Sequence, residues 1–201
     1  MVDEQLGDHP PPPEDLGQRD LPLLKYSDRL WRIYLGKYDN PLFFGKNTRH
    51  RFDAPDRSYG VCYCGCDIHV TFVETLGHSP GINFVTRTAL KARSLVAIRP
   101  NRDLEFVDLT AGGLRRLGAE GRLTSGSNYE SSRKWSQAIF EHPERVDGII
   151  YRSRNDQSRY SVAIFERAAD VLEVVDEWRL DSQPGMQKIL PVIEHYGFGI
   201  G

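Results

Sequence analysis

A strand and a helix that follow each other closely in the middle of the chain constrain its fold more than any other stretch. Residues 51–75 read RFDAPDRSYGVCYCGCDIHVTFVET, with a strand-like run that ends near Cys64 and a helix that begins near Asp67 as its N-cap. Too few residues separate the two elements for another domain to intervene. We therefore expect Tyr63 and Glu74 to lie on neighbouring elements.

Further strands and helices are scattered along the sequence without a regular alternation. The strand candidates are residues 25–35, 94–100, 104–109, 148–151, 161–165 and 171–178, and the helix candidates are residues 67–76, 110–121 and 128–142. The segment 186–201 mixes apolar residues with glycine and is expected to close over the sheet. Because strands outnumber helices, the sequence predicts an α+β fold, with a compact mixed sheet and short helices, rather than a regular βαβ winding.

The N-terminal segment differs in composition from the rest of the chain. Four consecutive prolines at positions 10–13 cannot continue a helix or pair in the middle of a sheet. We therefore expect residues 1–22 to form a disordered, Pro-rich tail. The remaining residues, 23–201, are enough for a single domain with its own hydrophobic core.

The charge balance and the lack of long apolar stretches narrow the functional classes. With 26 basic and 28 acidic residues, the formal net charge is −2, which argues against a direct nucleic-acid binder. No stretch of the sequence approaches the roughly 18 to 20 apolar residues of a membrane span. The acidic N-terminus is the opposite of a signal peptide, and three cysteines between positions 62 and 66 cannot form a disulfide framework. We therefore expect a cytoplasmic protein without membrane contact.

The cysteine cluster raises the question of a metal site. Cys62, Cys64 and Cys66 are followed by His69, but zinc sites usually space their thiolates two to four residues apart and draw a second pair from elsewhere. This sequence has no second pair, and the i, i+2 spacing fits three small side chains on one face of a strand. We expect buried cysteines and no bound metal. The Walker A, GxGxxG, HExxH and GxSxG motifs are also missing from the sequence.

Five side chains are candidates for a functional site, and each also has a simpler structural explanation. They are Arg32 in the first strand, Arg51 before an Asp-Ala-Pro turn, Tyr63, Glu74 and Ser153. A half-buried arginine or carboxylate needs a partner, which could be a ligand or only a core ion pair, and a serine at a strand end often caps a turn. Together, two guanidinium groups, a phenol, a carboxylate and a hydroxyl suit a site that binds phosphates and stabilises a sugar cation.

The order and surroundings of these residues resemble those of the RES domain family, which is named for its Arg, Glu and Ser signature. The matching segments are LWRIY with Arg32, RFDAP with Arg51, YGVCYCG with Tyr63, TFVET with Glu74 and DGIIYRSR with Ser153, together with GLRRLGAE, YESSRKWSQAIFEHP and YSVAIFER. The matching segments span roughly residues 25–168. The cysteines around Tyr63 are a departure, since apolar or small residues would be commoner there.

The resemblance implies an ADP-ribosyltransferase-like fold with a cleft that takes NAD+ as its substrate, and no cofactor. By this resemblance Arg32 and Arg51 hold the phosphates or the adjacent ribose of NAD+, and Tyr63 stacks on or orients the nicotinamide-side sugar. Glu74 stabilises the developing oxocarbenium ion or orients the nucleophile, and Ser153 hydrogen-bonds in the same cleft. The implied activity is that of an NAD+ glycohydrolase or phosphorylase. The same residues would also serve an ADP-ribosyltransferase that modifies a protein.

The resemblance also implies partners. Several RES proteins are toxins of bacterial toxin–antitoxin pairs, so we expect a toxin that depletes NAD+ and an Xre-like antitoxin that occludes the cleft. Any contact with DNA would belong to the antitoxin. A homodimer is expected by analogy only. The alternative is a non-catalytic RES module that binds a nucleotide or a partner without turnover, and the intact set of five residues argues against it.

Overall fold

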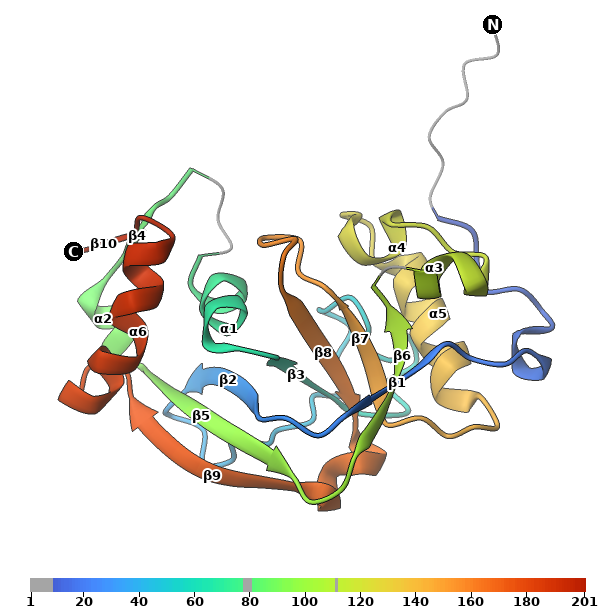
Figure 1. Cartoon of the computed structure of the whole chain (residues 1–201), viewed down its shortest axis with the longest axis horizontal. Coiled ribbons are helices and arrows are strands. Elements are labelled where there is room, and N and C mark those ends of the chain that lie inside the picture. Colours follow the sequence, from blue (N-terminus) through green and yellow to red (C-terminus); the bar gives the residue numbers. More distant parts are fainter. Residues whose placement is uncertain (1–8, 78–80, 111) are drawn as a thin grey trace, which may run out of the picture.

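An eight-stranded mixed sheet forms the centre of the molecule (Figure 1). The structure is a computed structural model and describes residues 9–77, 81–110 and 112–201. In spatial order the strands are β1 (Leu23–Tyr26), β6 (Leu104–Leu109), β7 (Gly148–Arg152), β8 (Tyr160–Phe165), β3 (Val61–Gly65), β2 (Leu30–Leu35), β5 (Arg93–Pro100) and β9 (Leu172–Arg179). Neighbours are antiparallel except β6 and β7, which are parallel. Two short strands, β4 (Phe84–Val85) and β10 (Gly199–Ile200), form a separate parallel pair.

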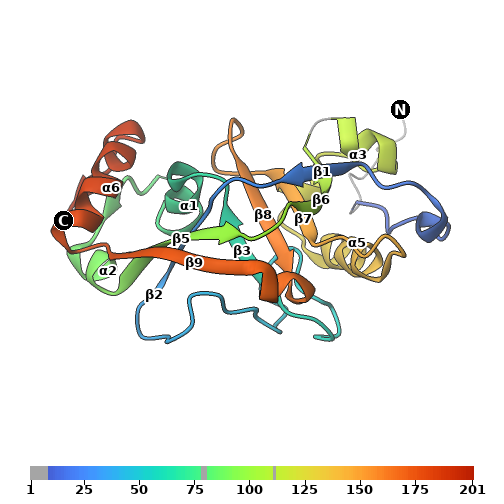
Figure 2. The same cartoon turned by 60° about the horizontal axis from the view of Figure 1, so that its bottom comes forward.

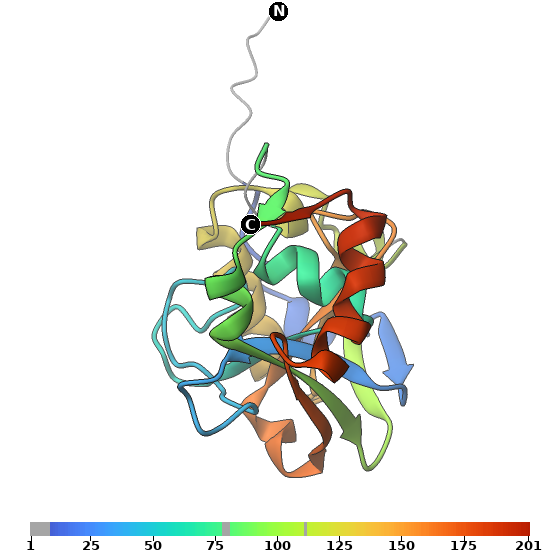
Figure 3. The same ribbon diagram turned by 90° about the vertical axis from the view of Figure 1, so that its left-hand side faces the viewer.

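Two groups of helices cover one face of this sheet (Figures 1 and 3). One group comprises α3 (Gly112–Leu117), α4 (Arg122–Ser125) and α5 (Glu130–Glu141), and the other comprises α1 (Ile68–Thr75), α2 (Arg87–Lys91) and α6 (Gln183–His195). The described residues also form two 3-10 helices, η1 (Leu16–Gln18) and η2 (Glu166–Val171). Each group covers its own cluster of buried apolar side chains. The predicted α+β class, with a mixed sheet and short helices, is confirmed.

The alternation of side chains along β3 separates the two faces of the sheet. Val61 belongs to the apolar cluster under α5, whereas Cys62 and Cys64 belong to a third cluster on the opposite face. Figure 2 shows β5 and β9 side by side along one edge of the sheet. Cys62 and Cys64 are buried and Cys66 is half-buried. The predicted packing of three buried cysteines on one face of a strand is therefore confirmed for Cys62 and Cys64, whereas Cys66 follows the end of β3.

Two predicted elements differ in extent from those in the structure. A single strand over residues 25–35 is wrong, because β1 pairs with β6 while β2 pairs with β3 and β5, so its two halves lie in different parts of the sheet. The helix predicted over residues 110–121 is interrupted at Gly118, whose φ of 76° ends α3 in a conformation that favours glycine. Residue 111 of that predicted helix lies outside the described residues.

The C-terminal segment contains a helix that the sequence did not predict. Ser182 is the N-cap of α6, and its hydroxyl accepts a hydrogen bond from the first turn. Ile189, Val192 and Ile193 recur at helical spacing and are buried in the cluster under α6. Pro191 lies on the exposed side of the helix, where its missing N–H is tolerated, and it hides the helical pattern in the sequence. The segment closes over the sheet as predicted, but it does so as a helix.

Residues 9–22 pack on α5, so the disordered tail predicted for residues 1–22 is wrong over this part. Leu16 is buried in the cluster that contains Trp135. The Trp135 indole N–H donates to the Pro10 carbonyl at 2.9 Å. Prolines lack an N–H, but their carbonyls still accept hydrogen bonds, so a Pro-rich segment can be fixed through its acceptors. The first eight residues of the predicted tail lie outside the described part of the chain.

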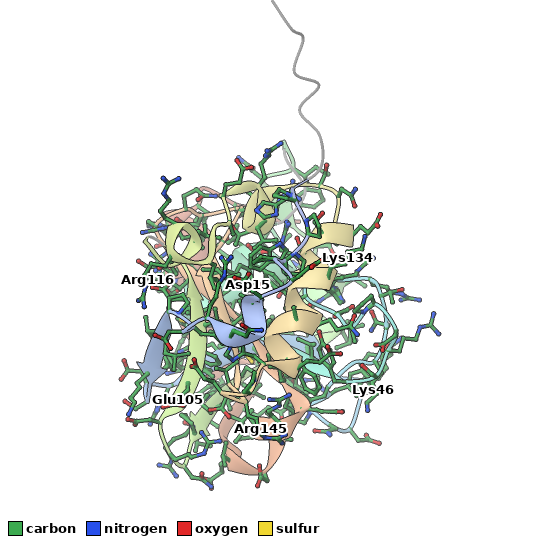
Figure 4. All side chains as sticks on the ribbon, turned by 90° about the vertical axis from the view of Figure 1, so that its right-hand side faces the viewer. Asp15, Lys46, Glu105, Arg116, Lys134 and Arg145 are labelled. Carbon is green, nitrogen blue, oxygen red and sulfur yellow. The ribbon has the colours of Figure 1, made fainter. Side chains whose placement is uncertain are left out.

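Charged side chains of both signs cover the end of the molecule formed by α3, α5 and the N-terminal segment. Those labelled in Figure 4 are Asp15, Lys46, Glu105, Arg116, Lys134 and Arg145. Asp15 pairs with Arg19 and Lys134 pairs with Glu130, each at 2.7 Å. This mixture of signs fits the formal net charge of −2. Within the described residues, no helix has the length and apolar character needed to cross a membrane.

Leu16→Ala tests the packing of the N-terminal segment. Leu16 is 2% exposed, and its truncation should lower the free energy of unfolding by about 2 to 5 kcal/mol because a cavity is left in the core. Leu23→Ala is the matched control, since Leu23 is 42% exposed and its truncation should change stability by less than about 0.5 kcal/mol. Urea unfolding followed by circular dichroism measures both. Equal effects of the two substitutions would show that the segment does not pack in solution.

Candidate active site

A cavity opens on the helix-covered face of the sheet, where β2 and β3 separate. These strands are paired at a single position, Trp31 with Gly65, and a cavity of about 380 Å³ lies beside it. Small-molecule sites usually have volumes of about 300 to 1,000 Å³. The lining residues are Trp31, Arg32, Ile33, His50, Arg51, Tyr63, Cys64, Gly65, Val70, Thr71, Glu74, Thr75, Thr124, Tyr129, Tyr151, Arg154 and Ser161. All the predicted site residues except Ser153 are among them.

Glu74 lies on the last turn of α1 and is held by Ser153 from the loop that follows β7. The helix begins after Asp67, whose carboxylate caps the first turn, as predicted. The hydroxyl of Ser153 donates to Glu74 Oε1 and accepts from the backbone N–H groups of Asn155 and Asp156, each at 3.0 Å. Because Ser153 is fully buried, these three hydrogen bonds fix one oxygen of Glu74 in place.

Arg51 reaches the same cavity from the side of α4 and α5. It is only 7% exposed. Its Cζ lies 4.6 Å from the centroid of the Tyr129 ring, and Nη1 donates to the Leu123 carbonyl at 3.4 Å. Burial lowers the pKa of Arg51 and the charge of Glu74 acts in the opposite direction, while an arginine stays protonated in either case. The cavity therefore has a buried cation on one wall and a carboxylate on the other.

Tyr63 presents its ring to the cavity while its hydroxyl is bonded elsewhere. The phenol donates to Asp53 Oδ1 and accepts from the Phe52 N–H, both at 3.0 Å. Burial, followed by the charge of Asp53, raises the pKa of Tyr63 well above its usual range, so the phenol stays protonated. The His50 ring lies beside it, with the ring centroids 5.2 Å apart. A ligand could therefore use the aromatic face of Tyr63 without disturbing its hydroxyl.

Arg32 lines the cavity, but its guanidinium is hydrogen-bonded to groups other than the predicted site residues. Its Nη1 donates to the Phe43 carbonyl at 3.1 Å and to Cys62 Sγ, which belongs to the cluster on the opposite face of the sheet. The pKa of Cys62 falls to about 7 through the hydrogen bond with Cys64 and the charge of Arg32, against the effect of burial. Arg32 therefore lines the cavity from β2, while its Nη1 is bonded to groups on the opposite face of the sheet.

The cavity lining also includes His50, Tyr129, Tyr151 and Arg154, which were not among the predicted site residues. Tyr151 and Arg154 flank Ser153 in the segment IIYRSR, and this neighbourhood was the available signal. Burial raises the pKa of Tyr151, and the charge of Glu74 adds to the effect. Arg154 is exposed at the cavity and provides a second cation there.

A polar network ties the β7–β8 loop to α1 and α6. Arg159 donates from Nη1 to Asp67 Oδ2 at 2.8 Å and from Nε to Asp156 Oδ2 at 3.0 Å. The Tyr196 hydroxyl donates to the same oxygen of Asp156 at 2.7 Å. Burial alone would raise the pKa of Asp156, but hydrogen bonds, including the one from Tyr196, and the charge of Arg159 hold it at about 2. This network fixes the loop that carries Ser153 relative to α1.

The cysteines and His69 do not converge on a common point. Cys62 and Cys64 lie in the cluster behind the sheet with their Sγ atoms 3.9 Å apart. His69 is on α1 and packs edge-on against His195 of α6, with the ring centroids 5.0 Å apart. In the portions of the chain that the structure describes, no group of three or more His, Cys, Asp or Glu side chains could hold a metal ion.

The protein thus has an α+β fold with one cavity that contains the Arg51 guanidinium and the Glu74 carboxylate, and Ser153 donates a hydrogen bond to this carboxylate. The sequence profile of the RES domain family matches residues 29–183, and the chain belongs to this family.

Two known proteins are similar to this one. A probable toxin of Sinorhizobium fredii (strain NBRC 101917 / NGR234), y4kH, is 32% identical over 85 residues, which are 42% of this chain and 66% of that protein. The match thus spans less than two thirds of the length of that relative. A chain in the crystal structure of the M. tuberculosis MbcT–MbcA toxin–antitoxin complex has a similar fold, with a TM-score of 0.67 at 17% identity. The alignment covers 88% of this chain and 97% of that one.

The network around Asp156 predicts that the free energy of unfolding falls in acid. The pKa of Asp156 is about 2 in the folded protein against an ordinary value of 3.8, so the ionised network stabilises the fold above pH 3.8 and is lost as the pH falls through about 2. Asp156→Asn should therefore lower stability at neutral pH and flatten its decline in acid. Asp56→Asn, which removes an exposed carboxylate bonded to Ser58 in its own turn, should change the slope less. Urea unfolding across this pH range measures the slopes, and an unchanged slope in Asp156→Asn would contradict the assignment.

Proposed function

We propose that this protein is an NAD+-consuming enzyme that cleaves the nicotinamide–ribose bond, as a glycohydrolase or phosphorylase. The supporting observation is that Glu74, bonded by Ser153, shares one cavity with the buried Arg51. NAD+ carries both groups that such a site can use, namely a diphosphate for arginine and a glycosidic bond to a cationic leaving group for the carboxylate. In this proposal NAD+ is the substrate and the protein uses no cofactor.

The proposed reaction needs charge stabilisation more than acid catalysis. The bond between ribose C1 and the nicotinamide nitrogen breaks, and its electron pair passes to the positively charged ring, which leaves as neutral nicotinamide. Positive charge develops on the ribose, and the fixed carboxylate of Glu74 stabilises it. Water or phosphate then bonds to C1, and an attacking water releases one proton. A single carboxylate is sufficient because the leaving group does not have to be protonated.

We propose that Arg51 and Arg154 bind the diphosphate. A buried cation such as Arg51 is costly unless anionic or aromatic groups surround it, and a bound phosphate would offset that cost. Arg154 is exposed and adds attraction without a desolvation penalty. The rings of Tyr63 and Tyr151 line the same cavity and offer apolar faces to the nicotinamide and its ribose.

We propose a supporting role for Arg32. Its Nη1 is bonded to the Phe43 carbonyl and to Cys62 Sγ, and both of these groups lie outside the cavity lining. Its bonds to these groups hold β2 beside the cavity.

We propose further that the protein is the toxin of a toxin–antitoxin pair. The similarity to a probable toxin of Sinorhizobium fredii and the fold shared with a chain of the MbcT–MbcA toxin–antitoxin complex support this proposal. An enzyme that consumes cellular NAD+ must be held inactive at rest, so we propose an Xre-like antitoxin that covers the cavity and carries any contact with DNA. A cytoplasmic location and a homodimer belong to the same proposal.

Glu74→Gln tests the central assignment. The amide keeps the size of the side chain but removes its charge, so nicotinamide release should fall by about 10²- to 10³-fold. Glu194→Gln is the matched control, because Glu194 is exposed on α6 and lies outside the cavity lining. The purified protein is incubated with NAD+, with and without inorganic phosphate, and the products are separated by chromatography. ADP-ribose indicates hydrolysis, and a phosphate-dependent ADP-ribose-1″-phosphate indicates phosphorolysis.

The same assay separates the alternatives. Absence of nicotinamide release from folded wild-type protein, free of any partner, would overturn the glycohydrolase and phosphorylase proposal. Transfer of labelled ADP-ribose to a protein would favour an ADP-ribosyltransferase. Binding of NAD+ in calorimetry without any turnover would favour a non-catalytic module. Growth arrest that depends on Glu74 when the protein is expressed alone would support the toxin role.

Arg154→Ala separates substrate binding from chemistry. Loss of this cation should raise KM for NAD+ by about 3- to 10-fold and leave kcat nearly unchanged, because the phosphates are held equally before and during bond cleavage. The effect should shrink as salt is added. Arg152→Ala is the control, because Arg152 donates to the Gln157 carbonyl at 2.7 Å and lies over the Tyr160 ring. A fall in kcat at unchanged KM would assign Arg154 to the chemical step instead.

A further inference from the structure

A buried carboxylate closes the loop that presents Arg51 to the cavity. Asp53 is 1% exposed, and its Oδ2 accepts from the backbone N–H groups of Arg49 at 3.0 Å and His50 at 2.8 Å. Its Oδ1 accepts from the Tyr63 hydroxyl at 3.0 Å. A buried carboxylate is costly unless its oxygens are hydrogen-bonded, and these three donors satisfy it.

The hydroxyl of Tyr63 joins this loop to the sheet. It accepts from the Phe52 N–H at 3.0 Å while it donates to Asp53, so it bonds both residues that follow Arg51. Tyr63 belongs to β3, which lies inside the sheet between β8 and β2. The backbone is thus fixed on both sides of Arg51, through the His50 N–H before it and the Phe52 N–H after it.

The guanidinium of Arg51 depends on this backbone for its position. Its bond to the Leu123 carbonyl is long, at 3.4 Å, and its Cζ lies over the face of the Tyr129 ring, 4.6 Å from the centroid. An aromatic face attracts a cation over a broad area and therefore fixes its direction only loosely. The direction of the side chain into the cavity follows mainly from where the loop places its Cα.

We propose that Asp53 and the Tyr63 hydroxyl form a positioning pair that aims Arg51 at the phosphates of the substrate. Neither group touches the substrate, and only the ring of Tyr63 does. This inference rests on the proposed function for its kinetic readout. A pair that merely stabilised the fold would affect unfolding without changing how the folded protein binds NAD+.

Tyr63→Phe removes the hydroxyl and keeps the ring, and Asp53→Asn keeps the size of the side chain while removing its charge. Each should raise KM for NAD+ by about 5- to 20-fold and change kcat by less than about twofold. In an Arg51→Ala background the same substitutions should raise KM by less than about a further twofold, because the side chain that they position is gone. Tyr26→Phe is the matched control and should leave KM unchanged, because its hydroxyl donates to the Arg29 carbonyl at 3.0 Å and not to this loop.

A second readout does not require turnover. Amide hydrogen exchange measured by NMR should speed up by about tenfold or more at Arg49, His50 and Phe52 in both variants, with other core amides little changed. KM effects that add fully to that of Arg51→Ala, or unchanged exchange at these amides, would overturn the proposal. If the wild-type protein releases no nicotinamide, the proposed function fails. Two measurements then still test the positioning pair by itself. One is the set of amide exchange rates, and the other is calorimetry with inorganic pyrophosphate, which the variants should bind more weakly than the wild type.

Discussion

The close approach of α1 to the end of β3 is the contact on which the site depends. A Cβ added at Gly65 would lie 2.3 Å from Thr71 Oγ1 and 2.6 Å from Val70 Cγ1, so the helix can pack at this distance only against glycine. Thr71 in turn donates to the Trp31 carbonyl at 3.1 Å, which joins the helix to β2 where β2 and β3 separate. Glu74 lies about one turn further along the helix, so its position beside the cavity follows from this packing.

The local parts of the site could be predicted from the sequence, and the long-range parts could not. The short spacing between β3 and α1 was enough to place Tyr63 and Glu74 on adjoining elements, and the cap at Asp67 depends only on its own turn. The bond from Ser153 to Glu74 joins residues 79 positions apart, and no periodicity in the sequence predicts such a contact. Family resemblance, rather than pattern, brought Ser153 into the predicted site.

Arg32 shows a second limit of the sequence, which concerns the faces of a strand. A period of two indicates that Arg32 and Ile33 face opposite ways, but it does not indicate which face the helices cover. In the structure the helices cover the face of Ile33, so the guanidinium of Arg32 lies behind the sheet. Composition misled in a similar way at the N-terminus, where the prolines predicted disorder and Leu16 is nevertheless buried. Both outcomes depend on which distant element packs on the segment.

Two loops far apart in the sequence fix the walls of the cavity by the same arrangement. Asp53 accepts from two successive backbone N–H groups of its own loop and bonds Tyr63 on β3. Ser153 likewise accepts from two successive N–H groups of its loop and donates to Glu74 on α1. In each case one buried side chain closes its loop and ties it to an element of regular structure. The cation and the carboxylate therefore have fixed positions before any ligand binds, which is what stabilising a developing charge requires, because groups that must reorganise during the reaction lose most of that effect.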